Sequence, residues 1–183
     1  MKRLAFLLAV VSVLLSGCAL LNRHSNRPNQ TSSSTSSVES PTNQKIISKV
    51  LVGKIDGIEH RDTITYQGKK LLRLRMELIS ELPQEITDVA ATMSPNELTK
   101  LIREAMQEDP DFVEAQRLDG FSADYSVTAD KKLQVVIDLD LQKINVDKVE
   151  DLSYFEDFGI SDIKDATPEM FILGMKLGGL KEE

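Results

Sequence analysis

The chain has 183 residues and a net charge of −7, from 22 lysines and arginines against 29 aspartates and glutamates. An acidic chain lacks the basic surface that binds nucleic-acid phosphates, which argues against nucleic acid as a partner. Tryptophan is absent and aromatic residues are 5% of the chain, which weighs against a surface that stacks on sugars or bases.

The first eighteen residues have the form of a bacterial export signal. Two basic residues are followed by an apolar run at 4–15 and then by Leu15-Ser16-Gly17-Cys18. This order is that of a secretory signal peptide. The motif LSGC resembles the lipobox of bacterial lipoproteins, in which the cysteine is lipidated and the chain is cut just before it. That resemblance implies removal of residues 1–17 and a new, acylated N-terminus at Cys18.

Two alternatives compete with a lipid anchor. A transmembrane helix needs about 20 apolar residues, and the run at 4–15 is too short. A plain signal peptide with an incidental cysteine is the other alternative. Cys18 is the only cysteine in the chain, so no internal disulfide can form, and lipidation would remove a free thiol. We therefore expect a cell-membrane protein, anchored through acylated Cys18 and facing the extracytoplasmic side.

Residues 18–44 have the composition of a tether. They include Thr-Ser-Ser-Ser-Thr-Ser-Ser at 31–37 and few aliphatic residues after Leu21. Such a segment cannot bury enough apolar surface to offset its ordering entropy, so it is expected to be disordered. The 28 residue-to-residue steps from Cys18 to Ile46 would span about 30 Å as a coil. Loss of Lys2 and Arg3 would leave a net charge of −9, which argues against electrostatic adhesion to anionic lipids.

The rest of the chain, 45–183, is expected to fold as a single domain that begins with a hairpin. Alternating residues from Ile58 to Tyr66 and from Leu72 to Leu78 predict two strands, joined by a turn at 67–70. Residues 45–52 are also β-prone, and Asp56-Gly57 reads as a turn or a bulge. This hairpin should have one buried face and one charged, wet face.

Helix signals and a second hairpin follow. Ser94-Pro95-Asn96-Glu97 is a capping box with proline at the first helical position, and this helix should end before Asp109-Pro110. A helical turn is expected within 87–93. Strands are predicted at 118–127 and 133–141, a loop with a helical turn at 145–158, and a last helix from Thr167-Pro168 to Gly178-Gly179.

Hairpin, helix, hairpin and helix in this order predict an α+β fold, in which two hairpins form an antiparallel sheet with helices packed on one face. The stretches DTITYQGKKLLRLRMEL, SPNELTKLIREAMQ and GFSADYSVTADKKLQVVIDLDLQK resemble the YehR-like family of small bacterial lipoproteins. The resemblance covers roughly residues 57–180. It implies an α+β domain outside the cytoplasm and carries over no active-site residue, because that family has no assigned function.

Candidates for catalysis or metal binding are few. No nucleophile elbow, zinc motif or phosphate-binding glycine loop occurs. His60, the only histidine after the tether, shares its strand side with Ile58 and Ile64, which favours a buried structural role over a catalytic one.

Asp138 and Asp140 share the other side of their strand, about 6.6–6.8 Å apart. With Asp130 or the acidic run at 147–157 they are weak candidates for a Ca²⁺ site. The alternative is that Arg73 and Arg75 pair with them on a solvated sheet face.

These observations predict a lipid-anchored binding or accessory module without a cofactor, whose partner is an envelope protein or a cell-wall ligand. Binding would use the charged sheet face or a groove between sheet and helices. A structural role in envelope assembly is the first alternative. An enzyme built from carboxylates is the second, and no catalytic residue is assigned.

Overall fold

The computed structural model describes residues 44–145, 148–149, 152–155, 163 and 166–183. Its strands are β1 (Ile46–Ile55), β2 (Ile58–Gln67), β3 (Lys70–Ser80), β4 (Phe121–Val127), β5 (Leu133–Asp140) and β6 (Lys181–Glu182). Its helices are α2 (Gln84–Ala90), α3 (Pro95–Gln107), α4 (Pro110–Ala115), the short η2 (Ser153–Phe155) and α7 (Pro168–Leu177).

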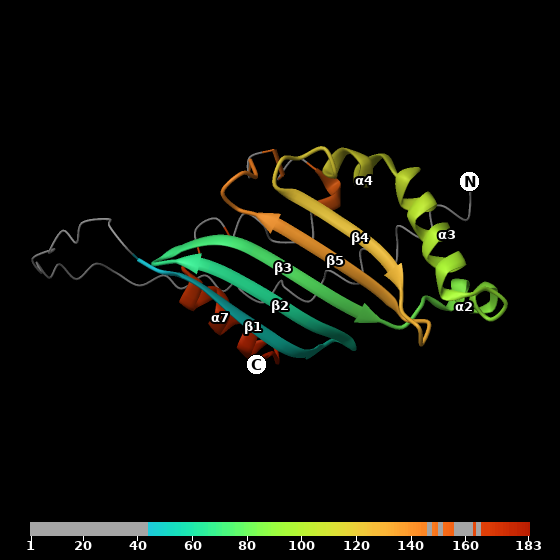
Figure 1. The fold of residues 1–183 in the computed structure, drawn as a ribbon, viewed down its shortest axis with the longest axis horizontal. Helices are drawn as coiled ribbons and strands as arrows, with labels where there is room; N and C mark the ends of the chain where they lie inside the picture. The colour runs from blue at the N-terminus through green and yellow to red at the C-terminus, as the bar shows by residue number, and fades with distance from the viewer. Residues whose placement is uncertain (1–43, 146–147, 150–151, 156–162, 164–165) are drawn as a thin grey trace, which may run out of the picture.

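Within this part of the chain, the strands form one antiparallel sheet in the order β4-β5-β3-β2-β1-β6. Figure 1 shows the sheet face-on, with α3 and α4 along the β4 side and α7 behind β1 and β2. The predicted α+β class is confirmed, with one difference in the helices: α3 and α4 follow a sheet edge, whereas α7 covers a face.

The first three strands are joined by tight turns. Ile55 pairs with Ile58, and the two residues between them, Asp56 and Gly57, have φ values of 50° and 88°. Positive φ at both positions is the geometry of a two-residue hairpin turn, so this segment is a turn and not a bulge. A register shift in the β2–β3 ladder lies between Thr65 and Tyr66. The predicted alternation holds from Ile58 to Ile64 on β2 and from Leu74 to Leu78 on β3, and it is interrupted at the shift, where Leu71 and Leu72 are both buried.

The predicted capping box is present at the start of α3. Glu97 donates its backbone N–H to Ser94 Oγ at 3.3 Å, and the Ser94 N–H donates to the Glu97 carboxylate at 2.8 Å. The helix ends at Gln107, as expected. Asp109 then caps a further helix, α4, by accepting the Asp111 N–H at 2.9 Å. The sequence reading treated Asp109-Pro110 only as a stop signal and so missed α4.

The second hairpin, β4–β5, joins the first through β5 and β3. Arg75 lies opposite Asp138 and Leu74 opposite Leu139 in that ladder. β4 is an edge strand, so the backbone groups on its free side have no partner strand in the described part of the chain. Side chains from the helices hydrogen-bond to these groups instead. Val127 N–H donates to Thr99 Oγ1 at 2.8 Å, Arg103 donates to the Tyr125 carbonyl at 3.0 Å, and Gln116 donates to the Ala123 carbonyl at 2.6 Å. This covering protects the edge from pairing with another chain.

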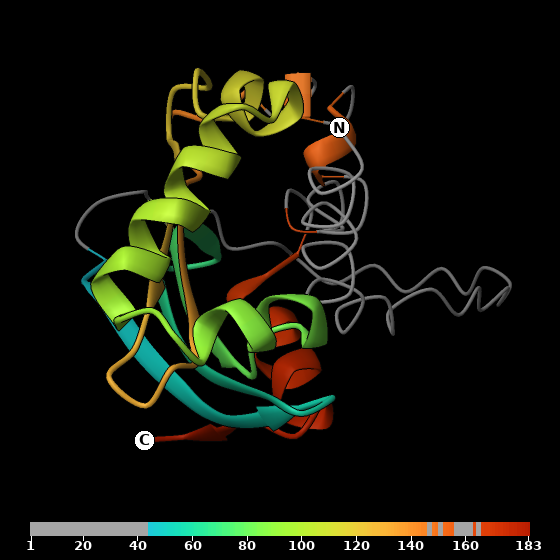
Figure 2. The same ribbon diagram turned by 90° about the vertical axis from the view of Figure 1, so that its right-hand side faces the viewer.

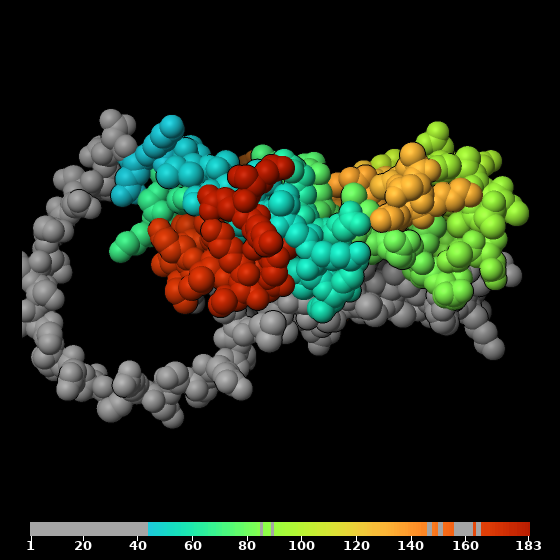
Figure 3. Space-filling model, turned by 90° about the horizontal axis from the view of Figure 1, so that it is seen from below, coloured from blue at the N-terminus to red at the C-terminus, as the bar shows by residue number. Residues whose placement is uncertain are grey.

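The core lies between the sheet and α7 and extends to α3 and α4. Figure 2 shows α7 inside the curve of β1 and β2. The buried apolar side chains form one cluster, in which Leu51, Ile64, Leu98, Leu139 and Val149 are fully buried. The last strand, β6, pairs with β1 through two residues only and was not predicted. Figure 3 shows α7 and the C-terminal residues next to β1 on the same side of the molecule.

Candidate functional site

The sheet face opposite α7, called the outer face below, carries the polar side chains of the strands. Arg73 and Arg75 come from β3 and Asp138 from β5. Arg73 donates to both Asp138 oxygens, from Nε at 2.7 Å and from Nη2 at 2.6 Å. The Nη1 of Arg75 lies 3.5 Å from Asp138 Oδ2. The pairing considered from the sequence is therefore present, and it places two arginines around one carboxylate.

Burial differs between the members of this arginine pair and their aspartate. The Asp138 side chain is only 12% exposed, whereas those of Arg73 and Arg75 are 57% and 43% exposed. Hydrogen bonding to Asp138 raises the pKa of Arg73 above its ordinary value. The carboxylate thus lies beneath the two guanidinium groups and holds them against the sheet, and the arginines remain open to solvent.

Asp140 is not part of this cluster. It accepts the Gln142 N–H at 3.1 Å, and Lys143 Nζ lies 3.4 Å from its second oxygen. Asp130, at the β4–β5 turn, accepts the Thr128 hydroxyl at 2.6 Å. Among the described residues, no three His, Cys, Asp or Glu side chains gather as a metal site would require. The other acidic residues considered for Ca²⁺, at 147, 150, 151, 156 and 157, lie outside the described residues.

Ion pairs also neutralise the margins of the outer face. Arg61 forms a bidentate ion pair with Glu183, in which Nη1 and Nη2 donate to the two carboxylate oxygens at 2.6 and 2.7 Å. Arg103 on α3 pairs with Asp124 at 2.6 Å. Such exposed pairs contribute little to stability, so their main consequence is a polar sheet surface with balanced charge.

A second polar site lies on the opposite, buried side of β2. His60 and Asp62 project toward the core together with Ile58 and Ile64, as the sequence predicted for His60. The Asp62 side chain is 0% exposed and the His60 side chain 11%. His60 Nδ1 lies 3.3 Å from Asp62 Oδ2. Asp62 Oδ1 has no hydrogen-bond partner in the described part of the chain.

The environment of Asp62 is unfavourable for a carboxylate. Across the ladders it lies opposite Leu51 on β1 and Met76 on β3, which are both buried. Burial raises the pKa of Asp62, and the hydrogen bond from His60 offsets this effect in part. Groups with such perturbed pKa values gather at functional sites but also occur in structural networks.

Within the described residues, the His60–Asp62 pair has no third member that would complete a hydrolase triad. Asp62 can orient the imidazole as the acid of a triad does, but the second ring nitrogen would have to contact a hydroxyl nucleophile. In the described residues, the structure gives His60 no hydrogen bond to a hydroxyl. What the structure bears out is the position predicted for His60, on the buried side of its strand.

Sequence reasoning had placed Asp62 on the same strand side as His60 but did not single it out as a site residue. The available signal was an aspartate in phase with Ile58 and Ile64 along a strand. Its complete burial follows from the sheet order, which places β2 between β1 and β3.

The residues expected to anchor the protein, the signal peptide 1–17, Cys18 and the tether 18–44, lie outside the described residues except for Gln44. None of the described helices has the length and apolar character to cross a membrane.

Together these features define a small α+β domain with an open, charge-paired sheet face. A family model matches residues 46–175, more than half of the chain, and shows that the chain belongs to the YehR-like family. This family consists of uncharacterised proteins.

Two solved structures share the fold. The NMR structure of a protein from Streptococcus pneumoniae TIGR4 has a TM-score of 0.68 and 22% identity, covering 88% of this chain and 99% of that one. The NMR structure of the E. coli YehR protein has a TM-score of 0.52 and 20% identity, covering 77% of this chain and 93% of that one. No curated protein matches the sequence.

Proposed function

We propose that this protein is a lipid-anchored, non-catalytic binding module on the extracytoplasmic side of a bacterial membrane, and that its outer sheet face binds a protein partner. The observation that carries the proposal is a pair of exposed arginines held on this face: Arg73 donates two hydrogen bonds to Asp138, and Arg75 donates one to Glu77 at 3.1 Å and lies 3.5 Å from Asp138. The envelope is the expected location because LSGC at 15–18 resembles a lipobox and Cys18 is the only cysteine.

Two properties of the arginine pair suit it to binding. Arginine is enriched at protein interfaces, where it often supplies a large share of the binding energy. A side chain that is already ordered loses less conformational entropy when a partner binds. Arg73 uses Nε and Nη2 for Asp138, so its Nη1 remains a donor for a partner's carboxylate or carbonyl.

The open face also provides room for a partner. In Figure 1 no described helix lies in front of β1, β2, β3 or β5. Thr63 and Thr65 lie opposite Arg75 and Arg73 in the β2–β3 ladder, so uncharged polar groups border the arginines. A polar surface with a few fixed arginines is typical of non-obligate interfaces.

Photo-crosslinking in cells tests this function. A photoreactive amino acid at Thr65, opposite Arg73, is expected to yield a discrete adduct with another envelope protein in the full-length, exported protein. Replacing both arginines (Arg73→Ala with Arg75→Ala) should reduce that adduct about tenfold or more, because two interface arginines together contribute at least ~1.4 kcal/mol.

The same photoreactive group at Asp56, in the β1–β2 turn, serves as the control and should give no such adduct. The double alanine variant leaves Asp138, whose side chain is 12% exposed, without its arginine partners, so its export level is measured beside the adduct and the adduct is scored relative to it. An adduct at Thr65 that persists in the double variant would contradict the proposed binding face, as would the absence of any adduct there.

A further inference from the structure

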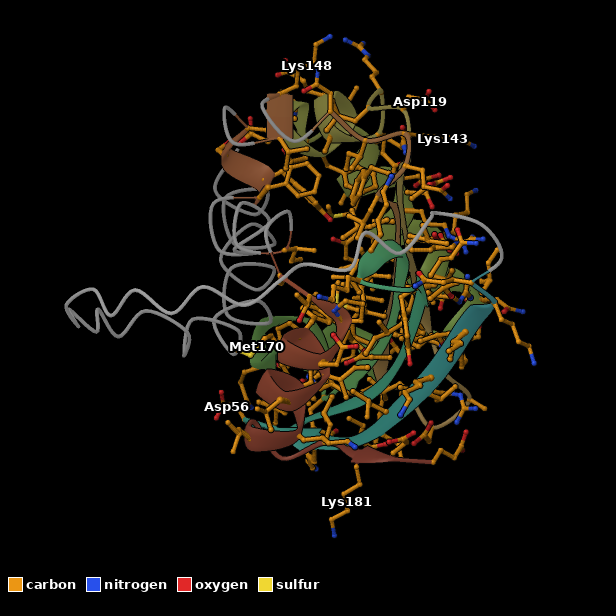
Figure 4. All side chains as sticks on the ribbon, turned by 90° about the vertical axis from the view of Figure 1, so that its left-hand side faces the viewer. Asp56, Asp119, Lys143, Lys148, Met170 and Lys181 are labelled. Carbon is orange, nitrogen blue, oxygen red and sulfur yellow. The ribbon has the colours of Figure 1, made fainter. Side chains whose placement is uncertain are left out.

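Helix α7 presents apolar side chains to solvent as well as to the core. Ile172 is buried against the sheet, whereas Met170, Leu173 and Leu177 are 58%, 51% and 79% exposed. The three exposed residues follow a spacing of three and four and share one side of the helix. Figure 4 shows Met170 on the side of α7 that points away from the strands. A helix that is apolar on both sides is usually buried on both sides.

The segments around this stripe carry no net charge, although the protein is acidic. Residues 45–67 and 168–183, which include β1, β2, α7 and β6, contain six lysines and arginines against six aspartates and glutamates, a net charge of 6 − 6 = 0, while the whole chain carries −7. Lys181 projects from β6 into solvent beyond α7 (Figure 4). A neutral surface does not repel anionic lipid headgroups as the rest of this acidic chain would, so the apolar stripe can enter a membrane interface.

A bilayer suits this stripe better than a second copy of the protein. Three side chains cover only a small part of the roughly 800 Å² that each partner of a stable dimer buries. The 25 residues between Cys18 and Gln44 would reach about 90 Å when fully extended. An acyl anchor at Cys18 would therefore keep α7 within reach of the same membrane and raise its effective concentration there.

We infer that α7 docks on the bilayer that carries the acyl anchor, with Met170, Leu173 and Leu177 inserted at the lipid interface. This inference rests on the lipid anchor of the proposed function. It also revises the expectation, drawn from the total charge, that the acyl chains alone hold the protein to the membrane. Docking through α7 turns the outer face, on the other side of the sheet, away from the lipid and toward a partner.

A charge bridge joins α7 to the sheet, in addition to the burial of Ile172. The carboxylate of Glu182 on β6 lies 2.7 Å from the Lys49 Nζ on β1 and 2.8 Å from the Lys176 Nζ on α7. These two lysines lower the pKa of Glu182 to about 2. The bridge ties the helix to the sheet, so that insertion of α7 would orient the whole domain.

Tryptophan fluorescence tests the inference, because the chain contains no tryptophan and a single substitution gives an unambiguous reporter. The acylated, full-length mature protein carrying Leu173→Trp would be reconstituted into phosphatidylcholine–phosphatidylglycerol vesicles, with and without brominated acyl chains. Trp at an inserted helix position should emit at shorter wavelength and lose about half or more of its intensity to bromine quenching. Thr65→Trp on the outer face is the control and should show neither change.

Flotation of the vesicles separates failure of this inference from failure of the anchor. Protein that floats but shows no quenching at Leu173→Trp would overturn docking through α7 while leaving the anchor intact. A blue shift without bromine quenching would indicate contact with another protein copy and would also overturn it. Protein that does not float would overturn the lipid anchor and this inference together.

Discussion

Replacing Asp62 with asparagine is expected to stabilise the protein at pH 8 by about 1–3 kcal/mol, the cost range of a buried polar group without a full set of partners. Asp62 is completely buried, and its Oδ1 lacks a partner in the described part of the chain. Asparagine has nearly the same shape and can still hydrogen-bond to His60, but it never carries the buried charge. Urea denaturation of the full chain and of the variant measures the difference.

The raised pKa of Asp62 also determines how the stability difference between the variant and the parent protein changes with pH. Burial raises the pKa of Asp62 above its ordinary value of 3.8, so the folded protein binds this proton more tightly than the unfolded chain does. The associated stabilisation is fully present below pH 3.8 and is lost as the pH rises through the raised pKa. The gap between Asp62→Asn and the parent protein should therefore widen from acidic pH toward pH 8.

Asp124→Asn is a matched control on the outer face, where the side chain is 61% exposed. This variant should change the free energy of unfolding by no more than about 0.5 kcal/mol. If Asp62→Asn were less stable than the parent at every pH, the ion pair with His60 would be net stabilising. The interpretation of Asp62 as a buried charge that destabilises the folded protein would then be wrong.

Replacing Gly120 with alanine is expected to cost about 2–5 kcal/mol, the sum of a backbone and a packing penalty. Gly120 has φ +88°, a conformation that residues with a Cβ rarely adopt. A Cβ here would also lie 2.7 Å from the Asp140 carbonyl oxygen and 2.8 Å from the Ile144 backbone nitrogen. Both atoms belong to the backbone and cannot move aside without disturbing the end of β5.

Gly57 isolates the backbone part of that cost, so the difference between the two variants gives the packing part. It has the same φ of +88°, but a Cβ there would meet nothing within 4 Å. Gly57→Ala should therefore show only the backbone penalty of about 1–2 kcal/mol. Thermal and urea unfolding of the two variants provide the comparison, and equal losses in both would refute the close approach of Gly120 to Asp140.

The elements that sequence reasoning recovered are those with a strong local cause. Ser94 and Glu97 mark the start of α3 by capping chemistry alone, and the alternation from Leu133 to Leu139 defines both faces of β5. The missed helix α4 had a local signal as well, because Asp109-Pro110 ends one helix and also supplies the N-cap and first residue of the next. The two-residue β6 has no pattern long enough to detect.

The candidate site depended on longer-range geometry. The sequence placed Arg73 and Asp138 on exposed strand sides, but only the β3–β5 pairing shows that they meet. The sequence predicted a last helix from Thr167-Pro168 but assigned its apolar residues to no particular face. Which of them face solvent depends on how the helix packs against β1 and β2, and this cannot be read from a helix in which both sides are apolar.

The most direct test of the proposed lipid-anchored module is intact-mass spectrometry of the protein purified from the membranes of the cells that make it. The account predicts a chain that begins at Cys18 and is heavier than residues 18–183 alone by the mass of two or three acyl chains. A chain cleaved without added lipid would make it a released protein. An uncut chain that begins at Met1 would equally contradict the acyl anchor, and with it the docking of α7 beside that anchor.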